Sequence, residues 1–134
     1  MQVQPYLFFE GSCEEAIGFY RKAVGAEVQM LMHYKDAPEQ GAATPGHPDK
    51  VMHASLKIGQ STVLMSDGRC SGKPAFSGLS LSLILRTAAE AQRAFAALAD
   101  GGDIAMPLAK TFFSPQFGML TDRFGLMWMV MVEE

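Results

Sequence analysis

His53 is the residue whose type and position best fit ligand or proton chemistry. It lies in the middle of an alternating run, where an imidazole can act as a general base or as a hydrogen-bond partner for a ligand. A structural histidine bonded to a neighbouring strand is the competing interpretation, because no carboxylate partner is evident. His33 and His47, at the end of a run and in a connector, are expected in solvent. No nucleophile–base spacing supports covalent catalysis, so no catalytic residue is assigned and enzyme activity stays open.

Further candidates for ligand binding come from the second half of the chain. They are Ser80, Ser82, Trp128, Met129, Phe112 and Phe113. The serines would orient a polar ligand or leave room for it. The tryptophan and the methionine would form a soft apolar wall, although core packing or a dimer interface accounts for them equally well. The two phenylalanines would form a flap over the ligand, with packing against the sheet as the alternative.

Hydrophobic periodicity predicts the strands that would position these residues. Apolar runs and alternating patterns favour strands at 3–9, 27–34, 51–58, 61–66, 79–86 and 103–106, the last of them stopped by Pro107. A closing hairpin is expected within 118–132, where Asp122 and Gly125 supply the turn. Its second strand is apolar on both faces, so we expect both faces to be covered.

Helical spacing of apolar residues predicts two helices, at Cys13–Val24 and Ala88–Ala99. A glycine follows each of them, as is typical of helix ends. Ser12 and Glu15 are expected to form a capping box at the start of the first helix. Connectors without periodicity are expected at 35–50 and 69–77.

In this order the elements form a β-α-β-β-β unit twice, over about residues 3–67 and 79–132. Glu15 and Tyr20 of the first helix align with Glu90 and Phe95 of the second. We therefore predict a single α+β domain of two βαβββ modules, whose mixed sheets curl around a cleft with the helices outside. The leucine face would meet the helices, which leaves the serine, histidine and methionine face for the cleft.

Four segments give this pattern a family resemblance. They read P-Y-L-F-F-E-G-S-C-E-E-A-I-G-F-Y at 5–20, V-M-H-A-S-L-K-I-G at 51–59, G-L-S-L-S-L at 78–83 and F-G-M-L-T-D-R-F-G-L-M-W at 117–128. Together they resemble the vicinal oxygen chelate superfamily, which contains glyoxalase I, ring-cleaving dioxygenases and bleomycin-resistance proteins. Within it the chain is similar to the PhnB-like group, also labelled 3-demethylubiquinone methyltransferase-like. The resemblance implies a glyoxalase/dioxygenase-like fold and a homodimer, since the superfamily often pairs modules between chains.

Enzymes of the superfamily commonly bind a divalent metal through histidine or glutamate from four strands. Pro5, Ser80 and Met129 stand at three of those positions in this chain, and near the fourth only Asp67 could serve. One hard oxygen ligand does not hold a transition metal, so neither a metal nor another cofactor is predicted. The methyltransferase label implies no activity either, because no glycine-rich loop opens a helix after a strand to bind an adenosine cofactor.

Composition argues against several classes of partner. With a net charge of −3 and no basic stripe, the chain is a poor candidate for binding nucleic acid or an anionic membrane. No apolar run approaches the ~20 residues of a membrane helix, and the first residues lack the pattern of a signal peptide. The two cysteines form neither a metal motif nor a disulfide framework. We therefore expect a cytoplasmic protein.

The function predicted from the sequence is the binding of a small, partly apolar molecule in the cleft between the repeats, without metal. A non-catalytic protein that sequesters a drug is the alternative, and an apolar face that serves only dimerisation is a third interpretation. A metal-dependent lyase or dioxygenase is a distant fourth interpretation. The ligand and its turnover stay open, because sequestration and catalysis need the same cleft.

Overall fold

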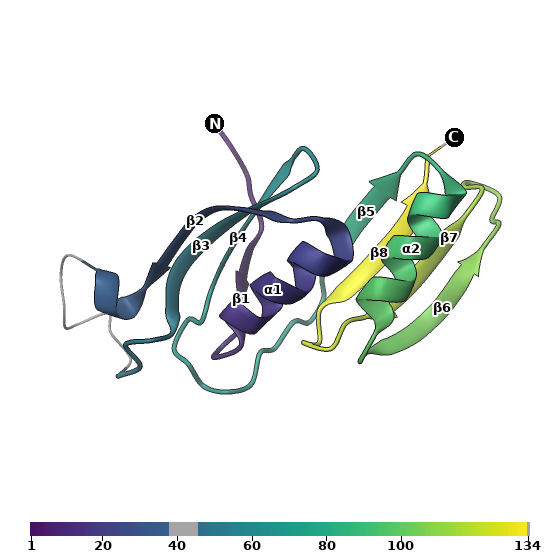
Figure 1. Ribbon diagram of the computed structural model, residues 1–134. Coiled ribbons are helices and arrows are strands. Elements are labelled where there is room, and N and C mark those ends of the chain that lie inside the picture. The colour runs from purple at the N-terminus through teal and green to yellow at the C-terminus, as the bar shows by residue number, and fades with distance from the viewer. Residues whose placement is uncertain (38–45, 134) are drawn as a thin grey trace. The chain divides into compact units, whose positions relative to one another are not determined.

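The computed structural model describes residues 1–37 and 46–133, and the chain divides into two compact units (Figure 1). The first unit comprises residues 1–75 and the second residues 76–134. Each unit contains one of the two predicted repeats.

The first unit is a four-stranded mixed sheet, sheet A, with one α-helix packed on it. Its elements are β1 (Tyr6–Phe8), α1 (Cys13–Val24), β2 (Glu27–His33), the 3₁₀ turn η1 (Tyr34–Asp36), β3 (Val51–Ile58) and β4 (Ser61–Ser66). The strands lie in the order β1-β4-β3-β2. β1 is parallel to β4, and the other neighbouring strands are antiparallel.

The second unit has a sheet of the same design, sheet B. Its elements are β5 (Leu81–Leu85), α2 (Ala88–Ala99), β6 (Asp103–Ala109), β7 (Phe117–Thr121) and β8 (Met127–Val132). The strand order is β5-β8-β7-β6, again with one parallel pair at the edge and antiparallel pairing elsewhere. The predicted α+β class and the duplicated βαβββ module are therefore confirmed.

Each sheet has a proximal face, covered by the helix of its unit, and a distal face turned away from that helix. In sheet B, a methyl group on Gly118 would lie 2.7 Å from the ring of Phe95 on α2, so Gly118 points at the helix. Its register partner Val130 is completely buried on the same face. Because neighbouring side chains of a strand point to opposite faces, Met129 and Met131 lie on the distal face.

Sheet A follows the same rule. Ala54, Leu56 and Met65 are completely buried on the proximal face, towards α1. His53 and Ser55 alternate with them along β3 and are partly exposed on the distal face. The predicted assignment is correct for His53 and Ser55 of sheet A and for the methionines of sheet B, but not for Met65, which is proximal, or for Leu64, which is distal.

Three local predictions are wrong. Ser12 precedes α1 but its side chain makes no capping hydrogen bond; its hydroxyl donates to the carbonyl oxygen of Phe9 at 3.1 Å instead. β6 continues through Pro107, which is tolerated because β6 is an edge strand where a missing N–H costs little. β5 begins at Leu81, later than expected, so Ser80 precedes the strand.

The connectors are described in part. The segment predicted to lack periodicity at 35–50 overlaps η1 at its start, and residues 38–45 lie outside the described part of the chain. Among the residues that are described, no helix has the length and apolar composition needed to cross a membrane.

Candidate functional site

Tyr6 and His53 form a hydrogen-bonded pair on the distal face of sheet A. The Tyr6 hydroxyl lies 2.9 Å from Nδ1 of His53, and the centres of the two rings are 5.6 Å apart. Tyr6 is 38% exposed, and His53 is partly exposed. The ring of Phe8, which is 51% exposed, lies 5.0 Å from the Tyr6 ring. An accessible polar pair thus lies beside an accessible aromatic surface.

The strand pairing explains how these two residues meet. Tyr6 is in register with Leu64 of β4, and Leu64 is in register with Ser55 of β3. Tyr6 therefore reaches His53 across β4, one step along the same face from Ser55. Met32 of β2 is the register partner of His53 and adds an apolar neighbour on the other side.

The pair can present itself to a ligand in two ways. If the Tyr6 hydroxyl donates to Nδ1 of His53, the Nε2–H group of His53 becomes a hydrogen-bond donor. If Nδ1–H donates to the Tyr6 oxygen, the Tyr6 hydroxyl becomes the free donor and Nε2 an acceptor able to take a proton. Both arrangements suit a ligand oxygen, and the second suits proton transfer.

Sequence reasoning identified His53 but missed Tyr6. The partner of His53 is 47 residues away in the chain, and no local spacing indicates such a contact. Alternation along β1 does separate Tyr6 and Phe8 from the buried Leu7. That alternation indicates the face on which Tyr6 lies. It does not place Tyr6 near β3, because this also requires the parallel pairing of β1 with β4.

The other predicted binding residues all belong to the second unit. Ser82 is exposed on the distal face of sheet B, in register with Met129. Ser80 is partly exposed just before β5. The structure thus brings Ser82 and Met129 together as neighbours on one face. The binding roles of these residues, and of His53, stay predictions.

Trp128 does not lie on the face predicted for it. It is 2% exposed on the proximal face of sheet B, and its indole N–H donates to Oδ2 of Asp122 at 2.9 Å. Oδ1 of the same carboxylate accepts the backbone N–H groups of Phe124 and Leu126. Trp128 and Met129 therefore cannot line one wall, because adjacent residues of a strand point to opposite faces. Trp128 belongs to the core and to the turn between β7 and β8.

Phe112 and Phe113 form the outer part of an aromatic stack. Phe113 packs edge-on against Phe117 of β7 with the ring centres 5.0 Å apart, and Phe112 packs edge-on against Phe113 at 5.1 Å. Phe117 is buried, Phe113 is 42% exposed and Phe112 is 98% exposed. Phe113 is thus fixed on the sheet, as the alternative interpretation held, while Phe112 remains available to a ligand.

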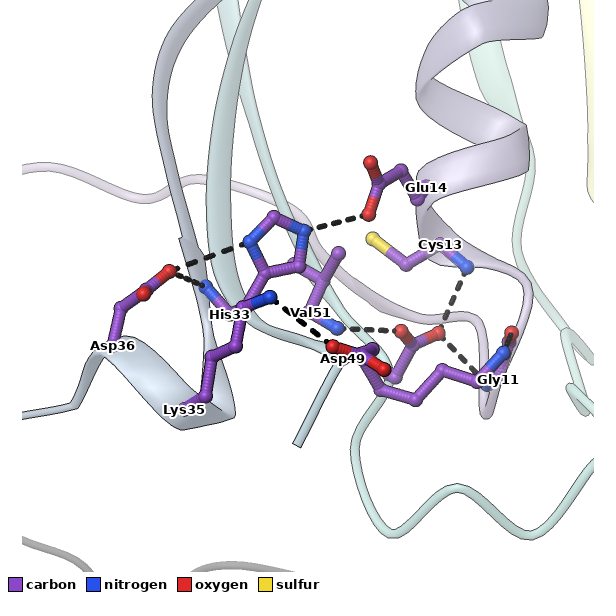
Figure 2. Close-up of polar contacts among 10 residues, drawn as sticks. Gly11, Cys13, Glu14, His33, Lys35, Asp36, Asp49 and Val51 are labelled. Atoms are coloured by element: carbon purple, nitrogen blue, oxygen red, sulfur yellow. Dashed lines mark hydrogen bonds and ion pairs between the residues drawn. The ribbon is translucent and has the colours of Figure 1, made fainter. Parts of the chain in front are cut away.

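His33 is held by two carboxylates, a feature that the sequence did not indicate. Its Nε2 lies 2.7 Å from Oε1 of Glu14 on α1, and its Nδ1 lies 3.4 Å from Oδ2 of Asp36 on η1 (Figure 2). The hydrogen bond to Glu14, together with the negative charge of both carboxylates, raises the pKa of His33 above its ordinary value, against a smaller effect of desolvation. His33 is partly exposed, as expected. Its two contacts link β2 with α1 and η1.

Asp67 is the one residue at a superfamily metal position that could bind a metal, and its carboxylate accepts hydrogen bonds from backbone N–H groups. It is 1% exposed, and its Oδ1 accepts the N–H groups of Gly11 and Cys13 at 2.8 Å each (Figure 2). Its Oδ2 accepts the N–H group of Val51 at 2.8 Å. A metal ion would have to displace these bonds, so the residues at this position do not fit one. Within residues 1–37 and 46–133, no cluster of three His, Cys, Asp or Glu side chains is suited to hold a metal.

The two thiols are poor nucleophiles at neutral pH. Burial, with the nearby Asp67 carboxylate adding to it, raises the pKa of the Cys13 thiol far above its usual range. Burial also raises the pKa of Cys70, where the positive charge of Lys50 opposes the shift only in part. Both thiols therefore stay protonated, and thiolate chemistry is not supported.

Comparisons with known proteins agree with this architecture. The sequence profile of a family described as 3-demethylubiquinone-9 3-methyltransferase matches residues 1–131. Protein YjdN of Escherichia coli strain K12 is 36% identical over 140 residues, which cover 98% of this chain and 95% of YjdN.

Solved structures show the same fold. Protein PA1353 from Pseudomonas aeruginosa is 40% identical, with a TM-score of 0.86 over 99% of this chain and 98% of that one. A PhnB protein from Bacillus cereus, described as a putative 3-demethylubiquinone-9 3-methyltransferase, is 29% identical, with a TM-score of 0.82 over 98% and 99%. The fosfomycin resistance protein FosX from Listeria monocytogenes shares the fold alone, at 8% identity and a TM-score of 0.67 over 100% and 93%.

Proposed function

This chain belongs to the family described as 3-demethylubiquinone-9 3-methyltransferase, a PhnB-like branch of the vicinal oxygen chelate superfamily. We propose that it binds a small, partly apolar molecule through the distal face of sheet A. The observation that carries this proposal is the Tyr6–His53 hydrogen bond of 2.9 Å on an accessible face. The pair is accessible to solvent and lies beside the exposed Phe8 ring, so a ligand can reach a polar group and an aromatic surface together.

The polar end of the ligand is assigned to Tyr6 and His53. A carbonyl, hydroxyl or carboxylate oxygen can accept from the Tyr6 hydroxyl or from Nε2–H of His53, depending on where the shared proton lies. The Phe8 ring, 51% exposed, offers a flat apolar surface next to that oxygen.

The apolar part of the ligand is assigned to the same unit, to the Phe8 ring and to Met32, the register partner of His53. Sheet B offers a second, independent apolar surface. Met129 and Ser82 are neighbours on the distal face of sheet B, and Phe112 is accessible at its side. Thioether side chains adapt to irregular apolar shapes, which suits a binding surface of this kind.

We propose binding without metal, because Asp67 is saturated by three backbone N–H groups. The methyl transfer in the family description is not part of the proposal. Each sheet has a single parallel pair, whereas the usual nucleotide-cofactor fold is a doubly wound parallel sheet.

A ligand-observed NMR screen tests the proposal. The library would contain small aromatic and aliphatic compounds that carry a carbonyl, hydroxyl or carboxylate group. Compounds that bind the wild-type protein should lose saturation transfer with Tyr6→Phe and His53→Ala, but keep it with Gln60→Ala in the exposed β3–β4 turn. Equal binding to all four proteins would refute the assignment. Spectra of each bound compound over hours distinguish turnover from sequestration.

A further inference from the structure

The methionines of sheet B are almost all on one face. The proximal face carries leucine, valine and tryptophan, which are buried against α2. The distal face carries methionine on three of its four strands, at positions 106, 119, 127, 129 and 131. By contrast, Met65 is completely buried in the core of the first unit. This separation sets the sheet B surface apart chemically from an ordinary aliphatic one.

Three of these methionines form a straight row across the sheet. Met106 of β6 is in register with Met119 of β7, and Met119 is in register with Met129 of β8. Side chains opposite each other on regular antiparallel strands have Cβ atoms ~4.5–5.5 Å apart, so Met119 and Met129 are direct neighbours, and Met106 is the register partner of Met119 between two irregularities of β6. Met106 is 44% exposed, and Met119 and Met129 are partly exposed, so a small oxidant can reach the row.

We propose that the row Met106–Met119–Met129 is a reversible oxidation site that converts the distal face of sheet B from an apolar to a polar surface. The inference rests on the proposed function in one respect, which is that a distal sheet face of this chain binds an apolar molecule. Oxidation would then release an apolar ligand bound to the distal face of sheet B.

The chemistry needs only a peroxide. The sulfur lone pair attacks one oxygen of hydrogen peroxide, a sulfur–oxygen bond forms and the oxygen–oxygen bond breaks. The second oxygen leaves as water after proton transfer. Sulfur is oxidised by two electrons and the peroxide is reduced by two, so no further reactant is required. Methionine sulfoxide reductases, one for each sulfoxide epimer, reverse the change.

The consequence follows from the polarity of the product. A sulfoxide oxygen accepts hydrogen bonds from water, and burying it under an apolar ligand without a partner costs free energy. Three sulfoxides in one row would affect any apolar ligand that spans neighbouring strands. The fold should survive, because the core of the unit lies on the proximal face, where Leu120, Trp128 and Val130 are buried.

Peptide mass spectrometry after a timed exposure to hydrogen peroxide tests the site. Met1, which is fully exposed, gives the upper reference rate within the same chain, and the buried Met65 gives the lower one. We expect the three row methionines to oxidise within about tenfold of Met1, and at least about tenfold faster than Met65, because oxidation follows exposure. If the three row methionines were oxidised as slowly as Met65, the proposal would be wrong. The cause would not matter, whether a second copy of the chain or another molecule covered the face.

The functional effect is measured with the apolar fluorescent probe 8-anilinonaphthalene-1-sulfonate. Peroxide should weaken probe binding to the wild-type protein about tenfold, and both reductases together should restore it. A Met106→Leu/Met119→Leu/Met129→Leu variant keeps side-chain volume nearly constant, and whatever affinity it has should be the same before and after peroxide. If this variant loses binding as strongly as wild type, or if wild type does not bind the probe, the inference is wrong.

A second variant guards against misfolding of the triple substitution. Met119→Leu alone interrupts the row at its centre and should reduce the peroxide effect by about a third, since it removes one of three oxidisable neighbours. Circular dichroism before and after oxidation separates unfolding from a surface change. These results are also distinct from the test of the proposed function. The proposed function fails if fragments bind the Tyr6 and His53 variants as well as they bind wild type, whatever the fluorescent probe does.

Discussion

The hydroxyl of Tyr6 lies 2.9 Å from Nδ1 of His53, although the two residues are on strands that are not neighbours in sheet A. The contact crosses β4, whose distal face carries Leu64 between them. It therefore connects the short edge strand β1 with the centre of the sheet. The same contact leaves both polar groups accessible, which is why we assign it to ligand binding.

Replacing His53 by alanine should weaken the affinity for any fragment found in the NMR screen by ~1–3 kcal/mol, the cost of leaving a polar partner unsatisfied. The thermal stability should change less, because His53 is on the distal face and outside the core. A melting curve and a titration on the same protein measure both. A structural role for His53 would produce the reverse, with a lower melting temperature and an unchanged affinity.

The charge of His33 should stabilise the first unit at low pH. Its pKa in the folded chain is raised above the ordinary 6.5, mainly by the hydrogen bond to Glu14. The stabilisation is therefore complete below about pH 6.5 and is lost as the pH rises through the folded pKa. The difference in melting temperature between wild type and Glu14→Gln should accordingly be largest in weak acid, at about pH 5–6.5, where carboxylates are ionised and the imidazole is charged, and should shrink as the pH rises through the folded pKa.

Ring NMR of the three histidines identifies the group responsible. The His33 signals should titrate at higher pH than those of a free imidazole, and Glu14→Gln should lower that pKa more than Asp36→Asn, since the Asp36 contact is longer at 3.4 Å. A titration of His33 at or below 6.5 in the wild-type protein contradicts this account.

Asp122 should be among the most destabilising positions to replace in the second unit. Its carboxylate is 3% exposed and accepts three donors, the backbone N–H groups of Phe124 and Leu126 and the indole N–H of Trp128. Asp122→Ala leaves these donors buried without that acceptor, and we expect a loss of ~3–5 kcal/mol of unfolding free energy in urea titrations. The exposed Asp103→Ala on β6 is the control and should change stability by less than about 0.5 kcal/mol.

Gly118 tests the close approach of α2 to sheet B. A methyl group there would lie 2.7 Å from the Phe95 ring and 3.0 Å from backbone atoms of Leu108 and Met106. Gly118→Ala should therefore destabilise the protein by ~1–3 kcal/mol through overpacking. Gly18 on α1 has open space around it, and Gly18→Ala should stabilise by ~0.5–1 kcal/mol. If both substitutions shifted the urea midpoint in the same direction, the packing described for Gly118 would be incorrect.

The purified protein should bind no stoichiometric zinc, nickel, iron or manganese. The reason is that both oxygens of Asp67 are occupied by backbone N–H groups, and the other superfamily ligand positions hold Pro5, Ser80 and Met129. Elemental analysis measures this directly. About one metal per chain, removed by a chelator together with fragment binding, would refute the prediction.

The sequence by itself determined the elements, the duplication and the face of the sheet on which most side chains lie. Both helices begin and end where the periodicity predicts, at Cys13–Val24 and Ala88–Ala99. His53, Ser82 and Met129 are distal, as alternation indicates. These properties are local, because the spacing of apolar residues along a helix or strand records which side is buried.

Only the tertiary structure decided which residues meet. The partner of His53 is 47 residues away, and Asp67 accepts N–H groups from Gly11 and Val51, 56 and 16 residues away. Asp67 also accepts the N–H group of Cys13, the first residue of α1, and no local capping pattern indicates that contact. A periodic pattern specifies a face but not the neighbouring strand, and the neighbours here follow from the parallel pairing of β1 with β4. That pairing joins residues 58 positions apart, such as Tyr6 and Leu64, so no local spacing in the sequence records it.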